Sequence, residues 1–295
     1  MARRAPLPVF ALVRDAYQTV SDNLQRLLRL GRAPFVLAFI LGLAFGAMRP
    51  HAWAPVASLA TVVAYAWFSF SVLRLVLLGA ERAELPANRS AADDGPLIPR
   101  SFLGTFMLRA LGLAVLMALG IAVMMLVVVY PLAVLPMSPQ EHQAMLARPG
   151  AFPTIILIVS AVLALLPVGV PVTRLVCILP ATAVDQDTTL AAAWRLSRGH
   201  GLRLALALAM IAAPFVLGYA ALDATLAMLA AMTDDGDPGF VVHAMALGLA
   251  TAMAMTATAL GSVVVARAWA ALAGFGAETA ATIRMPRGGQ SERAP

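Results

Sequence analysis

Long apolar stretches constrain this chain more than any other feature of its sequence. An α-helix of about 20 apolar residues crosses the roughly 30 Å hydrocarbon core of a bilayer. Apolar runs of that order are separated by short connections, and they lie near residues 33–48, 53–79, 106–136, 152–180, 202–231 and 241–273. We therefore expect six transmembrane helices.

The composition supports a chain embedded in a membrane. Hydrophobic residues make up 61% of it and charged residues 12%, which is more apolar than the surface of a water-soluble protein can cover. No long polar block remains for a separate soluble domain. The expected fold is all-α, a polytopic transmembrane helix bundle of six spans in three hairpins with cytoplasmic interfacial helices. We expect a cytoplasmic amphipathic segment over 1–32, the six-span domain over 33–275 and a disordered cytoplasmic tail over 276–295.

The distribution of arginine predicts the orientation. All 21 residues counted as Lys or Arg are arginines, and they gather in the N-terminal segment, the second and fourth loops and the tail. The first and third loops hold only Arg49 and Arg148, and the fifth, 234–238, is acidic. Because positively charged short loops stay inside, we expect both termini in the cytoplasm. Anionic lipid headgroups at that face are the expected partners of the basic chain, at about 1 kcal/mol per arginine, and no nucleic-acid partner is needed.

An amphipathic pattern precedes the first span. Apolar residues recur at steps of three and four, and they are Phe10, Val13, Tyr17, Val20, Leu24 and Leu27. The other face is polar, with Arg14 and Asp15 among its residues. This pattern predicts a helix that lies on the cytoplasmic leaflet and braces the first span. A partner-binding helix is the alternative.

A weak internal repeat is visible in the even-numbered spans. Each carries one arginine near its cytoplasmic end, and these are Arg74, Arg174 and Arg267. An acid follows each of them, at Glu81, Asp185 and Glu278. The pattern indicates three copies of an interfacial helix with a two-span hairpin, arranged around a pseudo-threefold axis. Snorkelling arginines in positive-inside loops would give the same pattern without repetition.

The segment 172–204 has the most readable local signals. Pro180 is placed to end or kink the fourth span, Asp187 to cap a helix that starts at Thr188, and Gly199 to stop that helix. Such a helix would carry Leu190 and Trp194 on one face, with Trp194 suited to an interfacial anchor.

A resemblance rests on the same segment. The run Arg174, Leu179-Pro180, Val184-Asp185, Ala193-Trp194 and Ser197-Arg198-Gly199 resembles the signature between the fourth and fifth spans of a broad group of bacterial six-span inner-membrane proteins. That group is similar to the membrane domain beside some glycerophosphodiester phosphodiesterases and includes stand-alone members. The resemblance implies the fold and a bacterial inner-membrane location. It does not imply the phosphodiesterase activity, because this sequence has no such catalytic domain.

Three ionisable residues are candidates for ligand contact within the spans. Asp223 would bind a proton or a cation if it lies at membrane depth, or would simply be hydrated if it lies at the outer interface. Arg174 and Arg267 would contact an anionic lipid or substrate, or would serve as snorkelled anchors.

Two prolines, Pro167 and Pro171, are the candidates for a break in the fourth span. They remove backbone donors and would expose carbonyl groups, as in transporter binding sites. Neighbouring helices that restore the lost hydrogen bonds are the alternative. Pro214 is expected to kink the fifth span.

The sequence predicts no catalytic residue, cofactor or metal ligand. Histidines fall at the three outer turns, at His51, His142 and His243, but without the spacing of metal ligands. We expect a non-enzymatic protein that organises the envelope or assists another membrane component, with a membrane-protein partner. The alternative is a carrier or channel for a small solute or lipid that uses the broken fourth helix.

Overall fold

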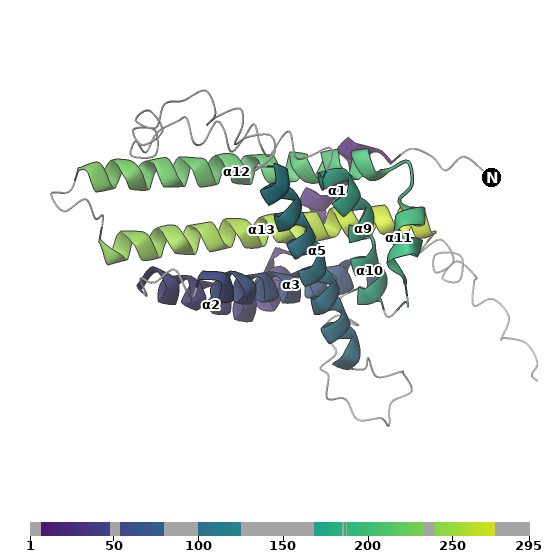
Figure 1. Ribbon diagram of the computed structural model, residues 1–295, viewed down its shortest axis with the longest axis horizontal. Helices are drawn as coiled ribbons and strands as arrows, with labels where there is room; N and C mark the ends of the chain where they lie inside the picture. Colours follow the sequence, from purple (N-terminus) through teal and green to yellow (C-terminus); the bar gives the residue numbers. More distant parts are fainter. Residues whose placement is uncertain are drawn as a thin grey trace, which may run out of the picture.

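The computed structural model describes residues 7–47, 54–79, 100–124, 168–184, 186, 188–232 and 239–274. Every regular element among these residues is a helix (Figure 1). The elements are α1 (Val9–Asp22), α2 (Leu24–Ala47), α3 (Ala54–Leu78), α5 (Arg100–Met124), α9 (Val170–Val176), α10 (Ile178–Ala183), α11 (Leu190–Leu196), α12 (Gly201–Ala231) and α13 (Phe240–Ala273).

Within the described part of the chain, five helices are long and apolar enough to cross a membrane. Their apolar windows are Leu24–Ala44, Ala60–Leu78, Leu103–Gly120, Gly201–Ala231 and Phe240–Ala273. They correspond to the predicted first, second, third, fifth and sixth spans. The chain is therefore a helical, multi-pass membrane protein. The predicted fourth span can be compared only over 168–180, because 152–167 lie outside the described residues. The predicted tail, 276–295, also lies outside them.

The last helix, α13, is the centre of the bundle. It packs against α1, α2, α3, α10 and α12, and in Figure 1 it lies between α12 on one side and α2 with α3 on the other. Its C-terminal half is largely buried, with Val264, Ala266 and Ala268 fully enclosed and Trp269 2% exposed. The small side chains of Val264, Ala266 and Ala268 let neighbouring backbones approach closely, which is how helices pack in a membrane.

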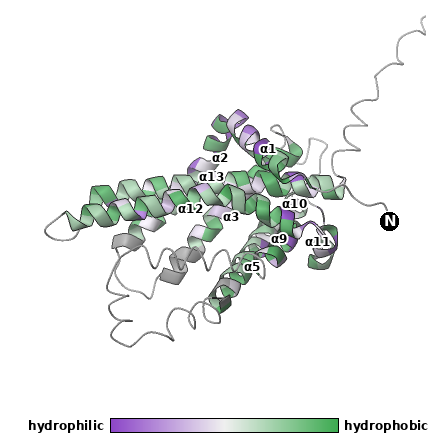
Figure 2. Ribbon diagram, turned by 90° about the horizontal axis from the view of Figure 1, so that it is seen from above, coloured by the Kyte–Doolittle hydropathy of each residue, from purple (hydrophilic) through white to green (hydrophobic). Residues whose placement is uncertain are grey.

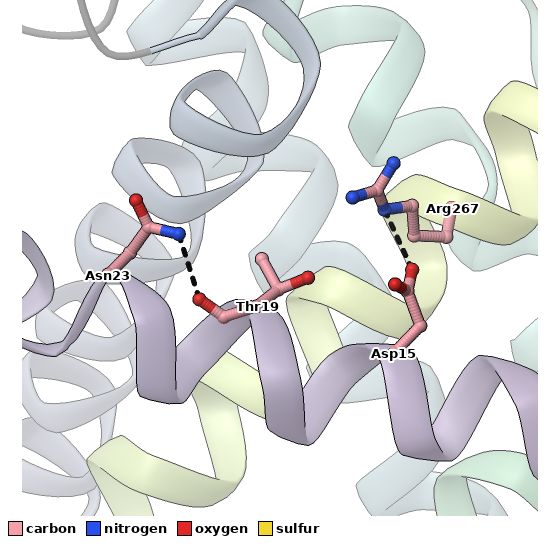
Figure 3. A network of polar contacts seen from close by, with 4 residues as sticks. All are labelled: Asp15, Thr19, Asn23 and Arg267. Atoms are coloured by element: carbon pink, nitrogen blue, oxygen red, sulfur yellow. Dashed lines mark hydrogen bonds and ion pairs between the residues drawn. The ribbon is translucent and has the colours of Figure 1, made fainter.

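The predicted first span begins earlier than expected. We expected it to start at residue 33, but α2 starts at Leu24 and continues through Pro34. Arg26, Arg29 and Arg32 are therefore exposed residues of the helix itself. The break between α1 and α2 falls at Asn23, whose side-chain Nδ2 donates to the carbonyl O of Thr19 at 2.9 Å (Figure 3). The same carbonyl O also accepts from the backbone N of Asn23 at 3.2 Å, so the side chain adds a second hydrogen bond at the end of α1.

The amphipathic prediction for the N-terminal segment is correct in kind but wrong in two details. Leu24 and Leu27 belong to α2, beyond the break. The apolar face of α1 also packs mainly against α12 and α13, with Leu12 and Ala16 buried, whereas Phe10 and Tyr17 remain exposed. Periodicity cannot distinguish a face that meets protein from one that meets lipid, because both are apolar.

Polar residues gather at one end of this bundle. Figure 2 shows hydrophilic residues around α1, α10 and α11, whereas the outer lengths of α12 and α13 are mostly hydrophobic. We call the region of α1, α9, α10, α11, the first turns of α12 and the last turns of α13 the polar end.

Trp269→Ala should destabilise the bundle far more than Trp67→Ala. Trp269 is 2% exposed in the core around α13, whereas Trp67 on α3 is 40% exposed. Removing a buried aromatic side chain leaves a cavity and costs about 3–5 kcal/mol. Thermal unfolding of each variant in detergent measures the difference. Equal melting temperatures for the two variants would contradict the central position of α13.

Candidate functional site

Arg174 is a charged residue of the polar end whose side chain contacts a second helix. It lies in the last turn of α9, and its guanidinium carbon is 3.5 Å from the centroid of the Trp194 ring. Its Nη2 also donates to the carbonyl O of Trp194 at 2.8 Å. A cation over an indole face contributes about 0.5–2 kcal/mol, and a hydrogen bond from a charged donor about 1.5–3 kcal/mol. Arg174 therefore ties α9 to α11.

Ser197 and Thr173 strengthen the same junction. The Ser197 Oγ atom is buried, 2.9 Å from the carbonyl O of Ala193 and 3.1 Å from that of Arg174, so its one proton can be donated to either. Thr173 Oγ1 lies 3.2 Å from the carbonyl O of Gly201, at the start of α12. The Ser197 hydroxyl can satisfy the carbonyl of Arg174 near the C-terminal end of α9, where carbonyls lack a partner within their own helix. Thr173 Oγ1 also lies 3.0 Å from the carbonyl O of Val170, so its one proton can be donated within α9 or to α12.

Gly201 gives Arg174 the space that it occupies. A Cβ atom at Gly201 would lie 2.6 Å from Arg174 Cγ and 3.0 Å from Arg174 Cδ. The arginine stem thus packs directly on the backbone of α12 while Trp194 covers its head. We call Arg174, Trp194, Ser197, Thr173 and Gly201 the arginine clamp. Three residues of the motif behind the resemblance, Arg174, Trp194 and Ser197, meet in it.

The local predictions for this segment are partly right. The helix that carries Trp194 exists, but it begins at Leu190 and is capped by Thr189, whose Oγ1 accepts from the backbone N of Ala192 at 3.2 Å. The prediction of a start at Thr188 is therefore wrong, and Asp187 lies outside the described residues. Thr189 can take the N-cap position in place of Asp187, because a threonine hydroxyl, like a carboxylate, accepts a hydrogen bond from a backbone N–H of the first helical turn.

The end of this helix follows its predicted signal more closely. α11 ends at Leu196, and Gly199 adopts φ +83° in the turn that follows, a left-handed conformation that favours glycine. Leu190 and Trp194 are both exposed, as a shared outer face requires.

The described part of the predicted fourth span is helical with one interruption, at Cys177. Gly169 has helical dihedrals, φ −62° and ψ −45°, and Pro171 lies in the first turn of α9, where a missing N–H is tolerated. The expectation of exposed carbonyls stays a prediction, because the carbonyls that Pro167 and Pro171 would free belong to residues 163 and 167, which lie outside the described residues. The helix is interrupted at Cys177, as expected from Pro180, which cannot donate to the carbonyl of Val176.

Two further arginines hold α10 in place. Arg74 on α3 is 6% exposed, its Nη1 donates to the carbonyl O of Ala183 at 3.2 Å, and its guanidinium carbon is 5.5 Å from the Phe70 ring centroid. Arg109 on α5 donates to Thr182 Oγ1. The last residues of α10 are thus bound by cations from two different helices.

Arg267 makes an ion pair with the first helix of the chain. Its Nε atom is 3.0 Å from Asp15 Oδ2, and both side chains are about half exposed (Figure 3). The pair joins α13 to α1. A pair this exposed is screened by solvent and contributes about 0–1 kcal/mol, so it sets position more than stability.

Two of these contacts follow the order of the predicted repeat. Arg174 binds α11, which precedes the next span α12, and Arg267 binds α1, which precedes α2. Ser69 and Ser262, each five residues before a repeat arginine, are hydrogen-bonded to each other at 2.8 Å between Oγ atoms. These contacts are compatible with a cyclic arrangement of related units.

Asp223 lies far from these arginines. It is an exposed residue of α12, 22 residues beyond Gly201, which corresponds to about 33 Å at 1.5 Å per residue. Arg174 contacts the first residue of that helix, so Asp223 and Arg174 do not form one site. Pro214 lies inside α12 without ending it.

No metal centre is present among the described residues. A group of three or more potential metal ligands is absent from the part of the chain that the structure describes. His243 lies in the first turn of α13, with Nδ1 3.2 Å from the carbonyl O of Gly239, and His51 and His142 lie outside the described residues.

Several residues of the polar end were not singled out by sequence reasoning. This group includes Thr182 and Gly201, together with Arg109 on the neighbouring helix α5. For Asp15, the sequence predicts only a place on the polar face of its helix. The sequence offered one signal, the closely spaced glycines Gly199 and Gly201, of which only Gly199 has a positive φ. Gly201 does not have the positive φ that favours glycine, so a glycine at this position indicates that another side chain packs closely on its backbone.

Comparisons with family models, with curated proteins and with solved structures found no match to this chain.

Gly201→Ala should displace Arg174 and loosen the arginine clamp. The new methyl group would overlap the arginine stem, and overpacking of this kind costs about 1–3 kcal/mol. Gly112→Ala on α5 is the matched control, because a Cβ there meets no heavy atom within 4 Å. Melting temperatures in detergent should fall for Gly201→Ala and stay equal or rise for Gly112→Ala. The reverse order would show that Arg174 does not pack on α12.

Asp15→Asn and Arg267→Gln should each lower stability by less than about 1 kcal/mol. The double variant should show a small coupling energy in a double-mutant cycle measured by thermal unfolding. Raising the salt concentration should shrink this coupling, since the pair is half exposed. A coupling of several kcal/mol, unaffected by salt, would contradict an exposed ion pair.

Proposed function

We propose that this chain is a non-enzymatic protein of a bacterial inner membrane that organises the envelope or assists another membrane component. The observation that carries the proposal is the use made of its arginines. Arg74, Arg174 and Arg267 each hold a helix of the same chain in place. Their cationic groups serve the packing of the bundle, which favours a supporting role over substrate chemistry.

The proposal includes an orientation with the polar end in the cytoplasm. Exposed arginines on α1, on the start of α2, on α11 and on the start of α12 support it, namely Arg14, Arg26, Arg29, Arg32, Arg195 and Arg203. The helix ends farthest from them carry Asp223 and His243. By the positive-inside rule, the arginine-rich end stays in the cytoplasm.

The carrier hypothesis has less support. It depended on an unwound backbone at Pro167 and Pro171, together with Asp223. The carbonyls that these prolines would free, at 163 and 167, lie outside the described residues, but Asp223 lies about 33 Å along α12 from the arginine clamp. The resemblance to stand-alone six-span proteins supports the location that we propose without indicating a transported species.

Asp223→Asn should leave the supporting function intact. In a strain that lacks the protein, wild type and Asp223→Asn should restore resistance to detergent equally, whereas Gly201→Ala should restore it less because the clamp is loosened. Gly112→Ala is the control for a glycine change without a steric consequence. Survival on detergent plates, with equal protein levels by immunoblot, measures the outcome.

Flux measurements on the wild type, Asp223→Asn and Pro171→Ala test the transport alternative. Full-length protein in proteoliposomes should show no saturable flux of small solutes or phospholipids. A saturable flux that is lost in Asp223→Asn or in Pro171→Ala would overturn the proposal in favour of a carrier.

A further inference from the structure

The surface of α11 and its surroundings combines exposed arginines with exposed large apolar side chains. We call this surface the α11 corner, and it comprises α11, the turn at 197–200 and the first two turns of α12. Its exposed apolar residues are Leu190, Trp194, Leu202 and Leu206. Its exposed cations are Arg195, Arg198 and Arg203.

The two kinds of side chain lie beside each other on α11. Successive residues of a helix are about 100° apart, so Leu190 and Trp194 share one side and Arg195 lies on the adjacent side. Ala193, which lies about 160° around the helix from Arg195, is fully buried. The helix thus presents an apolar edge and a cationic edge together, which suits the boundary between acyl chains and headgroups.

Along the chain around the α11 corner, positive charge exceeds negative charge. Over the described residues between 168 and 222, no side chain is acidic. Asp185 and Asp187 precede α11 and lie outside the described residues, yet even both of them are outnumbered by Arg195, Arg198 and Arg203 with Arg174. The complement of this surface is an anion.

The arginine clamp holds the corner rigid. Arg174 lies against one face of the Trp194 ring, and Trp194 remains 38% exposed. The cap from Thr189 fixes the start of α11, and the buried Ser197 hydroxyl fixes its end. A site whose frame is already ordered loses less conformational entropy when it binds a ligand.

We propose that the α11 corner binds the phosphate headgroup of an anionic phospholipid. Arg195, Arg198 and Arg203 would contact the phosphate oxygens, since guanidinium groups match phosphate geometry with paired hydrogen bonds. Trp194 lies at headgroup level, where its amphipathic ring is favoured. Leu202 and Leu206 meet the upper acyl chain. The inference rests on the orientation in the proposed function, because the corner must face the leaflet that carries the lipid.

The experiment compares two triple variants of the full-length protein in detergent. The corner variant is Arg195→Gln, Arg198→Gln and Arg203→Gln, and the matched variant is Arg26→Gln, Arg29→Gln and Arg32→Gln, which removes three exposed arginines from α2. Native mass spectrometry during titration with phosphatidylglycerol measures the bound lipid. The wild type and the matched variant should retain one tightly bound lipid, and the corner variant should bind at least about tenfold more weakly. Phosphatidylcholine should not compete.

Two outcomes would overturn the inference. Equal loss in both variants would show a diffuse attraction of arginines rather than a site. Displacement of the lipid by inorganic phosphate at similar concentration would show a site for soluble anions. Equal melting temperatures without lipid establish that both variants fold. A reporter fused after Pro295 tests the orientation separately, so a corner that binds lipid in detergent but faces outward would refute only the proposed orientation.

Discussion

The need to pair buried cations and helix-end carbonyls governs the packing of the polar end of this bundle. A guanidinium or carbonyl that is buried among side chains costs free energy when it has no hydrogen-bond partner. The chain meets this need by joining the two, since Arg74 and Arg174 donate to the main-chain carbonyls of Ala183 and Trp194. Each such bond also fixes one helix against another. These two arginines therefore hold helices of the polar end together through their charged groups.

Close packing around α13 complements these polar contacts. Its C-terminal half is enclosed by α1, α3 and α10, with alanines and valines at the closest approaches. Lipid tails are as apolar as side chains, so packing and interhelical hydrogen bonds such as Ser69 to Ser262 hold helices together here more than the hydrophobic effect does. The outer lengths of α12 and α13 lack this enclosure and expose large apolar residues such as Leu217 and Met245.

The sequence predicts the helical, multi-pass character and the end at which arginines collect, because length, hydropathy and charge act locally along the chain. It does not predict the partner of Arg267, because Asp15 is brought to it by the tertiary fold. It also places the cap of α11 at Asp187 instead of Thr189, since both residue types suit the position. The role of Gly201 depends on a side chain from another helix and is invisible to local patterns.

The contact between α1 and α13 has a consequence for biogenesis. α1 precedes α13 by more than 200 residues along the chain, and α13, on which it docks, is the hub of the core. The core therefore cannot close until α13 has been made. Until then α1 lacks its main neighbour in the folded bundle. Phe10 and Tyr17 stay outside the packed interface. They give α1 an apolar edge that can bind the membrane surface before α13 is present. Closure of the core thus comes after the earlier helices have been made.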